Sequence, residues 1–380
     1  MLKEKLSALN PKNMSAQQKH SFLRMGVSIL IGLGLATVLI LLTSDKPAES
    51  LKYYFTAPLQ NPNYFSYWIQ KTIPIIFTGV AVCVMFSANQ FNLGLEGAFL
   101  FGGLSAAVTN IYLTPNNPAL GIPLSMLFGI IIGAAITFIP ALLNRLFNAS
   151  IMVVSLMMNY ICLYFSMYLL FTYFKDPRTS KNTYNWAVKD PIMVMKWGKG
   201  NSQFTLFFSL FVAILVVILA WYFLYRTKMG YKLRMVGVNG NFAKYVGINV
   251  VSVAILTQII GGAIGGLGGA CEIMSNYINY SWVELTGFGW DGVTIAIFAK
   301  NNPKNVPLAA FFIAFLRTGA MVMSYKTNIQ SDLTSVIEGV VILFLLAEKF
   351  LSKTYRKMIV KETEERVRME QLALAEKEAK

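Results

Sequence analysis

The sequence has very little of what most enzyme sites are built from. It holds one histidine and three cysteines in 380 residues. His20 lies in a basic leader, and Cys83, Cys162 and Cys271 lack the paired spacing of a metal site or a disulfide framework. No G-x-x-x-x-G-K-[ST] segment occurs, so the chain has no P-loop for ATP. We therefore predict no enzyme activity, no cofactor and no metal, and any ATP hydrolysis must come from another polypeptide.

Charge is also scarce. Only 13% of the residues are charged, against 55% hydrophobic, and the mean hydropathy is +0.53. A soluble domain carries about 25% charged residues. A helix needs about 20 apolar residues to cross a bilayer, because its backbone groups find no water there. The composition therefore predicts an all-α, polytopic protein of the bacterial cell membrane, surrounded by the lipid bilayer.

We predict a basic cytoplasmic leader (1–24), a transmembrane domain (25–351) and a charged cytoplasmic tail (352–380). The tail is either a solvated helix or disordered. The domain is expected to hold about ten spans: 25–42, 72–87, 98–113, 122–143, 151–174, 204–225, 250–271, 293–299, 306–323 and 333–351. Most of the 33 lysines and arginines fall in segments on one side of this arrangement. By the positive-inside rule, both termini are expected in the cytoplasm.

Two glycine-rich segments occupy corresponding places. Residues 91–97 (FNLGLEG) follow the second span, and residues 287–292 (GFGWDG) follow the seventh. Each segment carries an acid, Glu96 or Asp291, and leads into a short helix. This pattern predicts an inverted repeat of spans 2–5 and 7–10. A superposition of the two halves would test it.

An acid within a membrane protein has two main explanations. Glu96 and Asp291 each lie near a predicted helix start, where a carboxylate is stabilised by free N–H groups and the helix dipole. Charged groups at membrane depth are also typical of a transport pathway. The sequence leaves both explanations open for each acid.

Glycines recur at every fourth position of the seventh span. Gly261, Gly265 and Gly269 form one stripe, and Gly262 and Gly266 lie in a second stripe beside it. Such stripes allow helices to approach closely. No strand precedes them, so they predict packing rather than a nucleotide site.

The cytoplasmic segment 226–249 is basic and rich in apolar residues. Two explanations remain open. Its apolar side chains fill a groove on a soluble partner, or the segment is a helix at the lipid surface, anchored by Lys and Arg. The side chains expected to fill such a groove are Leu233, Val236, Phe242, Tyr245 and Val246.

Four segments occur in one order: 91–97, 158–160 (MNY), 230–248 and 287–292. With them the chain resembles the permease subunits of bacterial ABC importers for nucleosides. The same group includes permeases for simple sugars and branched-chain amino acids. The likeness covers residues 72–351 and leaves out the leader and the tail.

The resemblance implies that the chain forms a translocation pathway for nucleosides, driven by ATP hydrolysis on a separate ABC ATP-binding subunit. A second homologous permease subunit would complete a heterodimer, and an extracytoplasmic substrate-binding lipoprotein would deliver the substrate. No nucleic acid is expected as a partner. One alternative is a permease for a simple sugar such as ribose or galactose. An alternative of another class is an ion-coupled secondary transporter, with Glu96 and Asp291 as ion sites.

The resemblance indicates which residues couple to the ATPase, while the pathway residues are expected from polar side chains within or beside the predicted spans. The expected pathway residues are Asn92, Glu96, Asn159 and Asp291. Asn159 lies in the middle of the fifth span, where its amide needs a polar partner, and a nucleoside offers hydroxyls and ring nitrogens. The residues expected to couple to the ATPase are Gly230, Leu233, Arg234, Val236, Gly237, Asn239, Tyr245 and Gly247.

Overall fold

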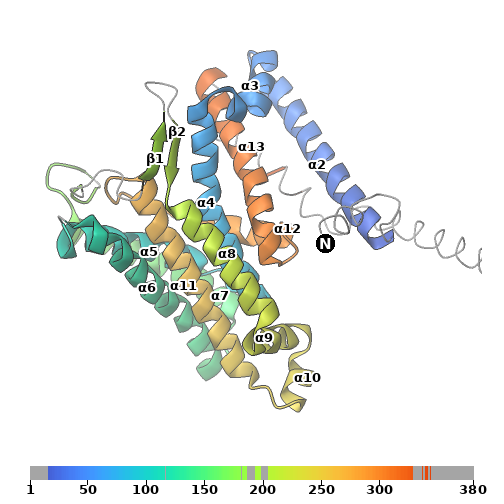
Figure 1. Ribbon diagram of the computed structural model, residues 1–380, viewed down its shortest axis with the longest axis vertical. Coiled ribbons are helices and arrows are strands. Elements are labelled where there is room, and N and C mark those ends of the chain that lie inside the picture. The colour runs from blue at the N-terminus through green and yellow to red at the C-terminus, as the bar shows by residue number, and fades with distance from the viewer. Residues whose placement is uncertain are drawn as a thin grey trace, which may run out of the picture. The chain divides into compact units, whose positions relative to one another are not determined.

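The computed structural model describes residues 16–115, 117–180, 182–185, 193–197 and 204–327, and positions 336, 339, 340 and 343. The chain forms two compact units, one of residues 52–323 and one of residues 1–51 with 324–380. Figure 1 labels the elements. The first part of the predicted leader (1–15), the predicted tail and, apart from those four positions, the predicted tenth span lie outside the described residues.

The described part of the smaller unit is mainly α2 (Ala16–Thr43) and the start of α3 (Pro47–Gln60). The helix α2 begins nine residues before the predicted first span. The helix α3 lies between the first two predicted spans, where no helix was predicted. Pro47 occupies the first helical position and Glu49 the first turn, which is where both residue types favour a helix.

The second span is longer than predicted. The helix α4 runs over Pro62–Phe86, 25 residues, rather than over 72–87. Asn61 caps it by accepting a hydrogen bond from the backbone N–H of Asn63, and Pro62 takes the first helical position. Asn followed by Pro is a helix start signal, and here the helix begins ten residues before the predicted second span.

The remaining predicted spans within the described residues each correspond to a helix. In chain order these are α5 (Leu95–Val108) with its π-helical continuation η2 (Thr109–Leu113), α6 (Pro118–Phe147), α7 (Ile151–Leu169) with η3 (Leu170–Phe174), α8 (Ser209–Arg226), α11 (Val250–Asn276), α12 (Phe288–Phe298) and α13 (Val306–Thr327). A 3-10 turn, η4 (Pro303–Asn305), precedes α13. Together α7 and η3 match the predicted fifth span, 151–174.

One element differs from the predicted helices. The strands β1 (Met193–Trp197) and β2 (Phe204–Phe207) form an antiparallel hairpin directly before α8. Residues 204–207 (FTLF) were predicted as the start of the sixth span. Aromatic and β-branched residues also favour strands. The Ser66 hydroxyl of α4 donates to the Thr205 carbonyl at 2.8 Å, which fixes the strand to the bundle.

The described helices make this a polytopic membrane protein. Six are long and apolar enough to cross a membrane: Pro62–Phe86, Ala119–Phe147, Ile151–Phe174, Ser209–Arg226, Val250–Asn276 and Pro303–Thr327. Two shorter apolar helices are Leu30–Thr43, within α2, and Phe288–Phe298. The short α12 is consistent with a helix that begins inside the bundle rather than at its end.

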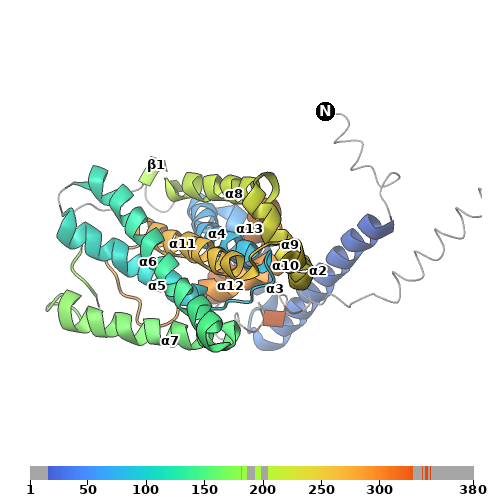
Figure 2. The same cartoon turned by 90° about the horizontal axis from the view of Figure 1, so that it is seen from below.

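The helix α11 forms the centre of the larger unit. It packs against α4, α5 and α6, and Figure 2 shows it among them. The predicted close packing of its glycines is confirmed. A Cβ atom on Gly262 or Gly266 would collide with the backbone of α6 at Gly133 and Gly129, and one on Gly269 would collide with the backbone of α5 at Phe99.

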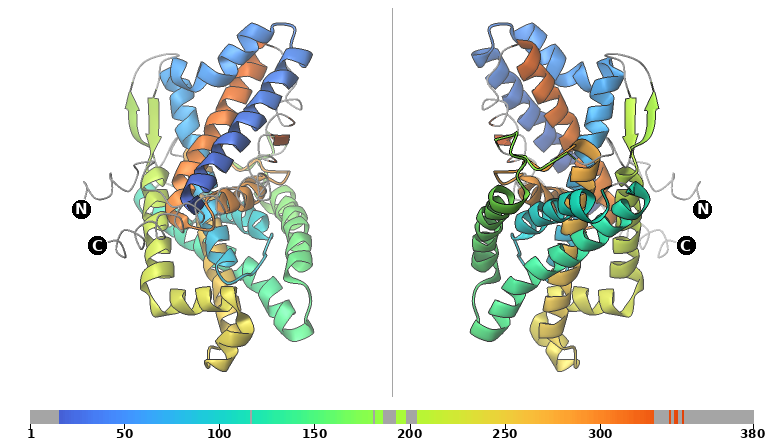
Figure 3. Two further views of the ribbon diagram at one scale, coloured as in Figure 1. Left: turned by 90° about the vertical axis from the view of Figure 1, so that its right-hand side faces the viewer. Right: turned by 90° about the vertical axis from the view of Figure 1, so that its left-hand side faces the viewer.

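The larger unit has two distinct ends. The short helices α9 (Lys228–Val238) and α10 (Gly240–Tyr245) lie at one end, and the β1–β2 hairpin lies at the other in both views of Figure 3. Gly237 of α9 contacts the backbone of Ser87 at the end of α4. The predicted cytoplasmic segment is therefore mostly helical and packs onto the bundle.

Candidate functional site

Two helix N-termini meet inside the bundle. The helix α5 starts after the turn that follows α4, and α12 starts after the loop that follows α11. A Cβ atom built on Gly289 of α12 would lie 2.7 Å from the backbone nitrogen of Glu96 in α5, so only glycine allows this approach. Each N-terminus presents free N–H groups and partial positive charge. A hydrogen-bond acceptor is needed where the two helix N-termini meet.

Glu96 supplies that acceptor. Its side chain is fully buried. One carboxylate oxygen accepts from the Thr286 hydroxyl at 2.7 Å and from the backbone N–H of Gly287 at 2.6 Å. The other accepts from the backbone N–H of Gly289 at 2.5 Å. The carboxylate lies in the first turn of α5, yet it caps the start of α12.

Asn159 holds the turn that leads into α5. It lies on the buried face of α7. Its Oδ1 accepts from the backbone N–H of Gly97 at 3.0 Å, and its Nδ2 donates to the Leu93 carbonyl at 2.8 Å. Both ends of the amide therefore bind the α5 entry. The sequence required a polar partner for Asn159, and the fold supplies a backbone partner.

The buried Asn92 binds the same turn from within. Its Oδ1 accepts from the backbone N–H of Gly94 at 2.6 Å, and its Nδ2 donates to Gln258 Oε1 of α11 at 2.6 Å. The Ser155 hydroxyl of α7 accepts from the backbone N–H of Leu93 at 3.0 Å. Side chains from two neighbouring helices thus fix the non-helical backbone that positions Glu96.

Asp291 has a different partner. It lies in the first turn of α12, whose N-cap is Gly287. Its carboxylate forms a two-contact ion pair with the Arg317 guanidinium of α13, and one of the contacts measures 2.6 Å. Asp291 therefore lies in the first turn of α12 without forming a side-chain cap hydrogen bond. The pair joins α12 to α13 at a partly buried position.

The structure thus brings three of the four expected pathway residues together. Asn92, Glu96 and Asn159 converge on the α5 entry, and Asp291 lies on the neighbouring α12. In the part of the chain that the structure describes, no group of three His, Cys, Asp or Glu side chains is arranged to hold a metal ion. The arrangement builds a rigid polar junction between helix ends.

An open cavity lies elsewhere, between α5, α6 and α7. It has a volume of about 240 Å³, and its lining includes Phe101, Leu104, Phe128, Ile132 and Phe174. This lining is almost wholly apolar. It offers few partners to the hydroxyls of a sugar or nucleoside.

The predicted coupling segment has a buried side. Gly230, Leu233, Val236 and Ala243 are buried, so Leu233 and Val236 cannot fill a groove on another protein. A Cβ atom on Gly230 would collide with the backbone of α8 at Phe223. The Arg234 guanidinium lies 4.9 Å from the ring centre of Tyr225. These residues hold α9 against the bundle.

The other side of the segment is exposed. We define the α9–α10 patch as Val238, Phe242, Tyr245 and Val246, which are all exposed. Asn239 joins the two helices by capping α10, and Gly247 ends α10 with a φ of +85°, which glycine adopts without strain. Among the predicted coupling residues, Tyr245 is 92% exposed.

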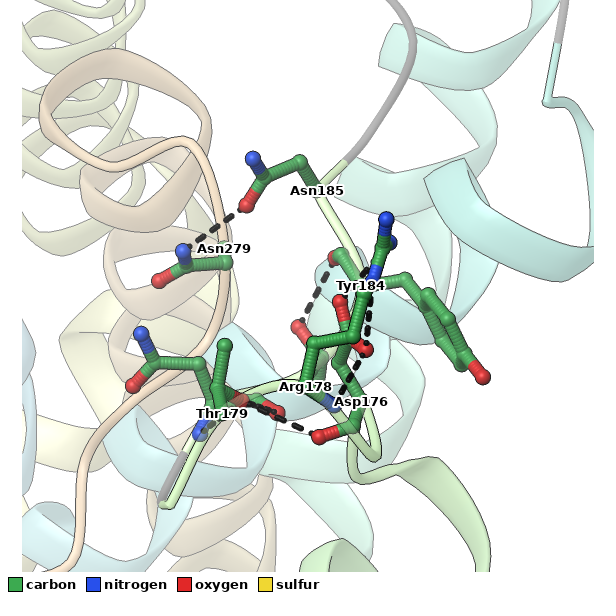
Figure 4. A network of polar contacts seen from close by, with 8 residues as sticks. Asp176, Arg178, Thr179, Tyr184, Asn185 and Asn279 are labelled. Carbon is green, nitrogen blue, oxygen red and sulfur yellow. Dashed lines mark hydrogen bonds and ion pairs between the residues drawn. The ribbon is translucent and has the colours of Figure 1, made fainter.

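At the opposite end, two loops bind each other. Figure 4 shows the loop after η3 beside the loop after α11. Asn279 Nδ2 donates to Asn185 Oδ1 at 2.9 Å, and the Thr183 N–H donates to the Tyr280 carbonyl at 3.0 Å. Hydrogen bonds from Arg178 lower the pKa of the Asp176 carboxyl below its ordinary value. The second loop leads directly to Gly287.

Comparison with known proteins identifies this architecture. A family model described as "Branched-chain amino acid transport system / permease component" matches residues 64–346. The chain belongs to this permease family. The permease is therefore a component of an ABC transporter that does not itself hydrolyse ATP, and it is a multi-pass protein of the cell membrane.

Three relatives resemble this permease over most of their length. The guanosine ABC transporter permease protein NupP of Bacillus subtilis is 27% identical, covering 84% of this chain and 91% of NupP. The nucleoside ABC transporter permease protein NupB of Lactococcus lactis is 26% identical, covering 86% and 90%. The glucose ABC transporter permease protein TsgB13 of Haloferax volcanii is 25% identical, covering 87% and 88%.

Sequence reasoning missed several partners in the permease site. Gln258, Thr286 and Arg317 bind the predicted residues from other helices and loops. Arg317 carried a signal, because an arginine within a predicted span needs a partner. Gln258 carried the same signal in the seventh span. Which acid or amide each one contacts depends on tertiary packing.

Proposed function

We propose that this permease forms, with a second homologous permease subunit, the pathway of an importer for nucleosides. ATP hydrolysis on a separate ABC ATP-binding subunit drives transport, and an extracytoplasmic substrate-binding lipoprotein delivers the substrate. The observation that carries the proposal is the likeness to two nucleoside permeases, NupP and NupB, over more than four fifths of the chain. A nucleoside is neutral, and the described helices carry few charges.

The packing supports the ten-span arrangement with an inverted repeat of spans 2–5 and 7–10. In each proposed half, a long helix (α4 or α11) is followed by a non-helical entry and a shorter helix (α5 or α12). The long helix of each half packs against the shorter helix of the other, α4 against α12 and α11 against α5. In transporters built from such repeats, broken helices meet near the membrane midplane. We place Asn92, Glu96, Asn159 and Asp291 there, as the junction that holds the helices lining the pathway.

The α9–α10 patch is the proposed contact with the ATP-binding subunit. Its exposed apolar side chains and the basic residues around them suit a soluble partner. The end that carries the patch is then cytoplasmic. We place both termini and the 352–380 tail on the same side, in agreement with the distribution of Lys and Arg.

Uptake of labelled nucleosides tests the proposal. Cells or vesicles with this permease, the second permease, the ATP-binding subunit and the binding lipoprotein should import guanosine. An ATP-binding subunit that cannot hydrolyse ATP should abolish import, while a protonophore at constant ATP should leave it intact. Import that survives the inactive ATPase but collapses with the protonophore would favour an ion-coupled transporter.

A simple sugar is the second candidate substrate. The likeness to the glucose permease TsgB13, at 25% identity over 87% of the chain, favours it. A competition experiment distinguishes nucleosides from sugars as the substrate. Unlabelled guanosine and other nucleosides should block guanosine uptake, while glucose, ribose and galactose should not. Import of labelled sugar, unaffected by nucleosides, would replace nucleosides with a sugar as the substrate.

A further inference from the structure

Three tyrosines form a stripe along α7. Tyr160, Tyr164 and Tyr168 recur at every fourth residue, and their side chains are 55%, 65% and 53% exposed. Residues four apart lie on the same face of a helix, about 6 Å apart along its axis. The opposite face of α7 is buried and includes Asn159, which binds the α5 entry. The tyrosine stripe therefore points away from the packed bundle.

The depth of the stripe is unusual for tyrosine. The apolar span Ile151–Phe174 is 24 residues long, and the three tyrosines lie in its middle part. Tyrosine favours the two membrane interfaces, where its hydroxyl reaches water. At mid-depth, a lipid-facing hydroxyl has no hydrogen-bond partner, and burying a hydroxyl without one costs free energy. Three such groups on one face argue against contact with lipid tails.

The helix α8 shows what a lipid-facing helix of this protein looks like. It lies on the opposite flank of the bundle from α7 (Figure 2). Its exposed side chains through the middle of the span are Phe211, Ile214, Leu215, Ile218 and Leu219. Its exposed tyrosines, Tyr222 and Tyr225, occur only in the last turns of the helix. This is the arrangement expected in lipid, whereas α7 exposes its three tyrosines in mid-span, beside the apolar Met157, Ile161 and Phe165.

We propose that the tyrosine stripe of α7 lines the translocation path and stacks against the base of the nucleoside. The inference rests on the proposed function and adds the residues that recognise the substrate. An aromatic ring offers a flat face to any heterocyclic base, and a phenol hydroxyl both donates and accepts hydrogen bonds. The α7 span contains no charged side chain, so a neutral ligand passes without an ion pair. Successive rings at one spacing provide successive, similar contacts along the path.

Accessibility of introduced cysteines tests the first half of the inference. The background is the assembled transporter with Cys83, Cys162 and Cys271, all buried, replaced by alanine. Y160C, Y164C and Y168C are compared with I214C, I218C and L219C on α8. A charged, water-soluble methanethiosulfonate reagent should modify the α7 cysteines and leave the α8 cysteines unmodified. Equal protection of both sets would overturn the inference, because the stripe would then not face water.

Protection by substrate tests the second half. Guanosine should slow modification of Y164C and Y168C, and glucose should not. Modification that guanosine leaves unchanged would overturn base stacking. If the wild-type transporter does not import nucleosides, the proposed function fails, while labelling without substrate still tests whether the stripe faces water.

Uptake kinetics add a test that needs no cysteine modification. Loss of base stacking weakens binding by about 5-fold to 150-fold per base. Tyr164→Leu should therefore raise the KM for guanosine within this range, while Tyr164→Phe, which keeps the ring, should change it much less. A matched control is Ile218→Leu on α8, which should leave the KM unchanged. An equal KM for Tyr164→Leu and wild type would contradict the inference.

Discussion

At the scale of single residues, the polar side chains of the bundle centre bind backbone. Glu96 accepts two backbone N–H groups of another helix, and Asn159 binds the backbone on both sides of Glu96. Non-helical backbone at membrane depth requires such partners, since no water is available there. These residues therefore allow two helices to begin inside the bundle.

Replacement of Glu96 should destabilise the permease. Glu96→Ala leaves the Thr286 hydroxyl and two buried N–H groups without an acceptor, at about 1–3 kcal/mol each. Glu96→Gln keeps one acceptor oxygen and should be less damaging. Unfolding in detergent can be followed with a thiol-reactive fluorophore, because the three cysteines are buried and free.

The control for Glu96 is Glu49→Gln. Glu49 lies in the first turn of α3, and its exposed carboxylate is 3.9 Å from the ammonium of Lys46. Exposed pairs of this kind contribute little, so this variant should unfold at the wild-type temperature. A Glu96→Ala protein as stable as wild type would contradict the capping role.

The Asp291–Arg317 pair should behave as a unit. Asp291→Asn removes the carboxylate that pairs with the partly buried guanidinium, and loss of one partner of a buried pair costs about 3–5 kcal/mol. The double variant Asp291→Asn, Arg317→Met should recover part of that loss. Unfolding temperatures of the two single variants and the double variant measure the coupling, and strictly additive effects would show that the pair is not coupled.

At the scale of elements, α11 determines how closely the helices approach. Its glycines lie against backbone of α5 and α6, which cannot move aside as a flexible side chain does. This packing brings Gln258 Oε1 of α11 to 2.6 Å from Asn92 Nδ2. A bulky residue on the stripe would therefore change the site as well as the packing.

A methyl group at Gly266 should test this. Gly266→Ala places a Cβ atom against the Gly129 carbonyl, and overpacking of this kind costs about 1–3 kcal/mol or more. The control is Gly34→Ala in α2, where a Cβ atom meets nothing within 4 Å. We expect a lower unfolding temperature for the first variant only. Equal unfolding temperatures for the two variants would contradict the close packing of α6 against α11.

At the scale of the whole molecule, one end of the bundle carries an exposed apolar patch. The α9–α10 patch exposes 86% of Val238 and 92% of Tyr245, while its buried side fixes it to α8 and to the end of α4. A rigid connection of this kind can pass a movement from an attached subunit to the entry of α5. The patch is thus the expected contact for the ATP-binding subunit.

Polar substitutions in the patch should weaken that assembly without unfolding the permease. Val238→Ser with Tyr245→Ser should reduce co-purification of the ATP-binding subunit by about tenfold, which corresponds to about 1.4 kcal/mol. The control is Leu120→Ser, an exposed residue at the start of α6 near the opposite end. An unchanged yield for the double variant would place the ATPase contact elsewhere.

The sequence by itself determined the class of protein, the positions of most spans and the polar segments between them. Apolar runs and glycine-rich turns are local signals, and they located α7 and η3 over 151–174 and the short α12, whose start was placed five residues too late. The sequence did not separate the start of α4 from a loop, or β2 from the start of α8, because aromatic residues suit interfaces, strands and helices alike.

Only the tertiary structure decided what the polar residues do. The partners of Glu96 lie 190 to 193 positions away in the chain, and those of Asn159 lie 62 and 66 positions away. A local sequence signal requires a partner for a buried acid or amide but does not identify it. The partner is determined by the close approach of α11, α5 and α12, which brings two helix N-termini to the Glu96 carboxylate.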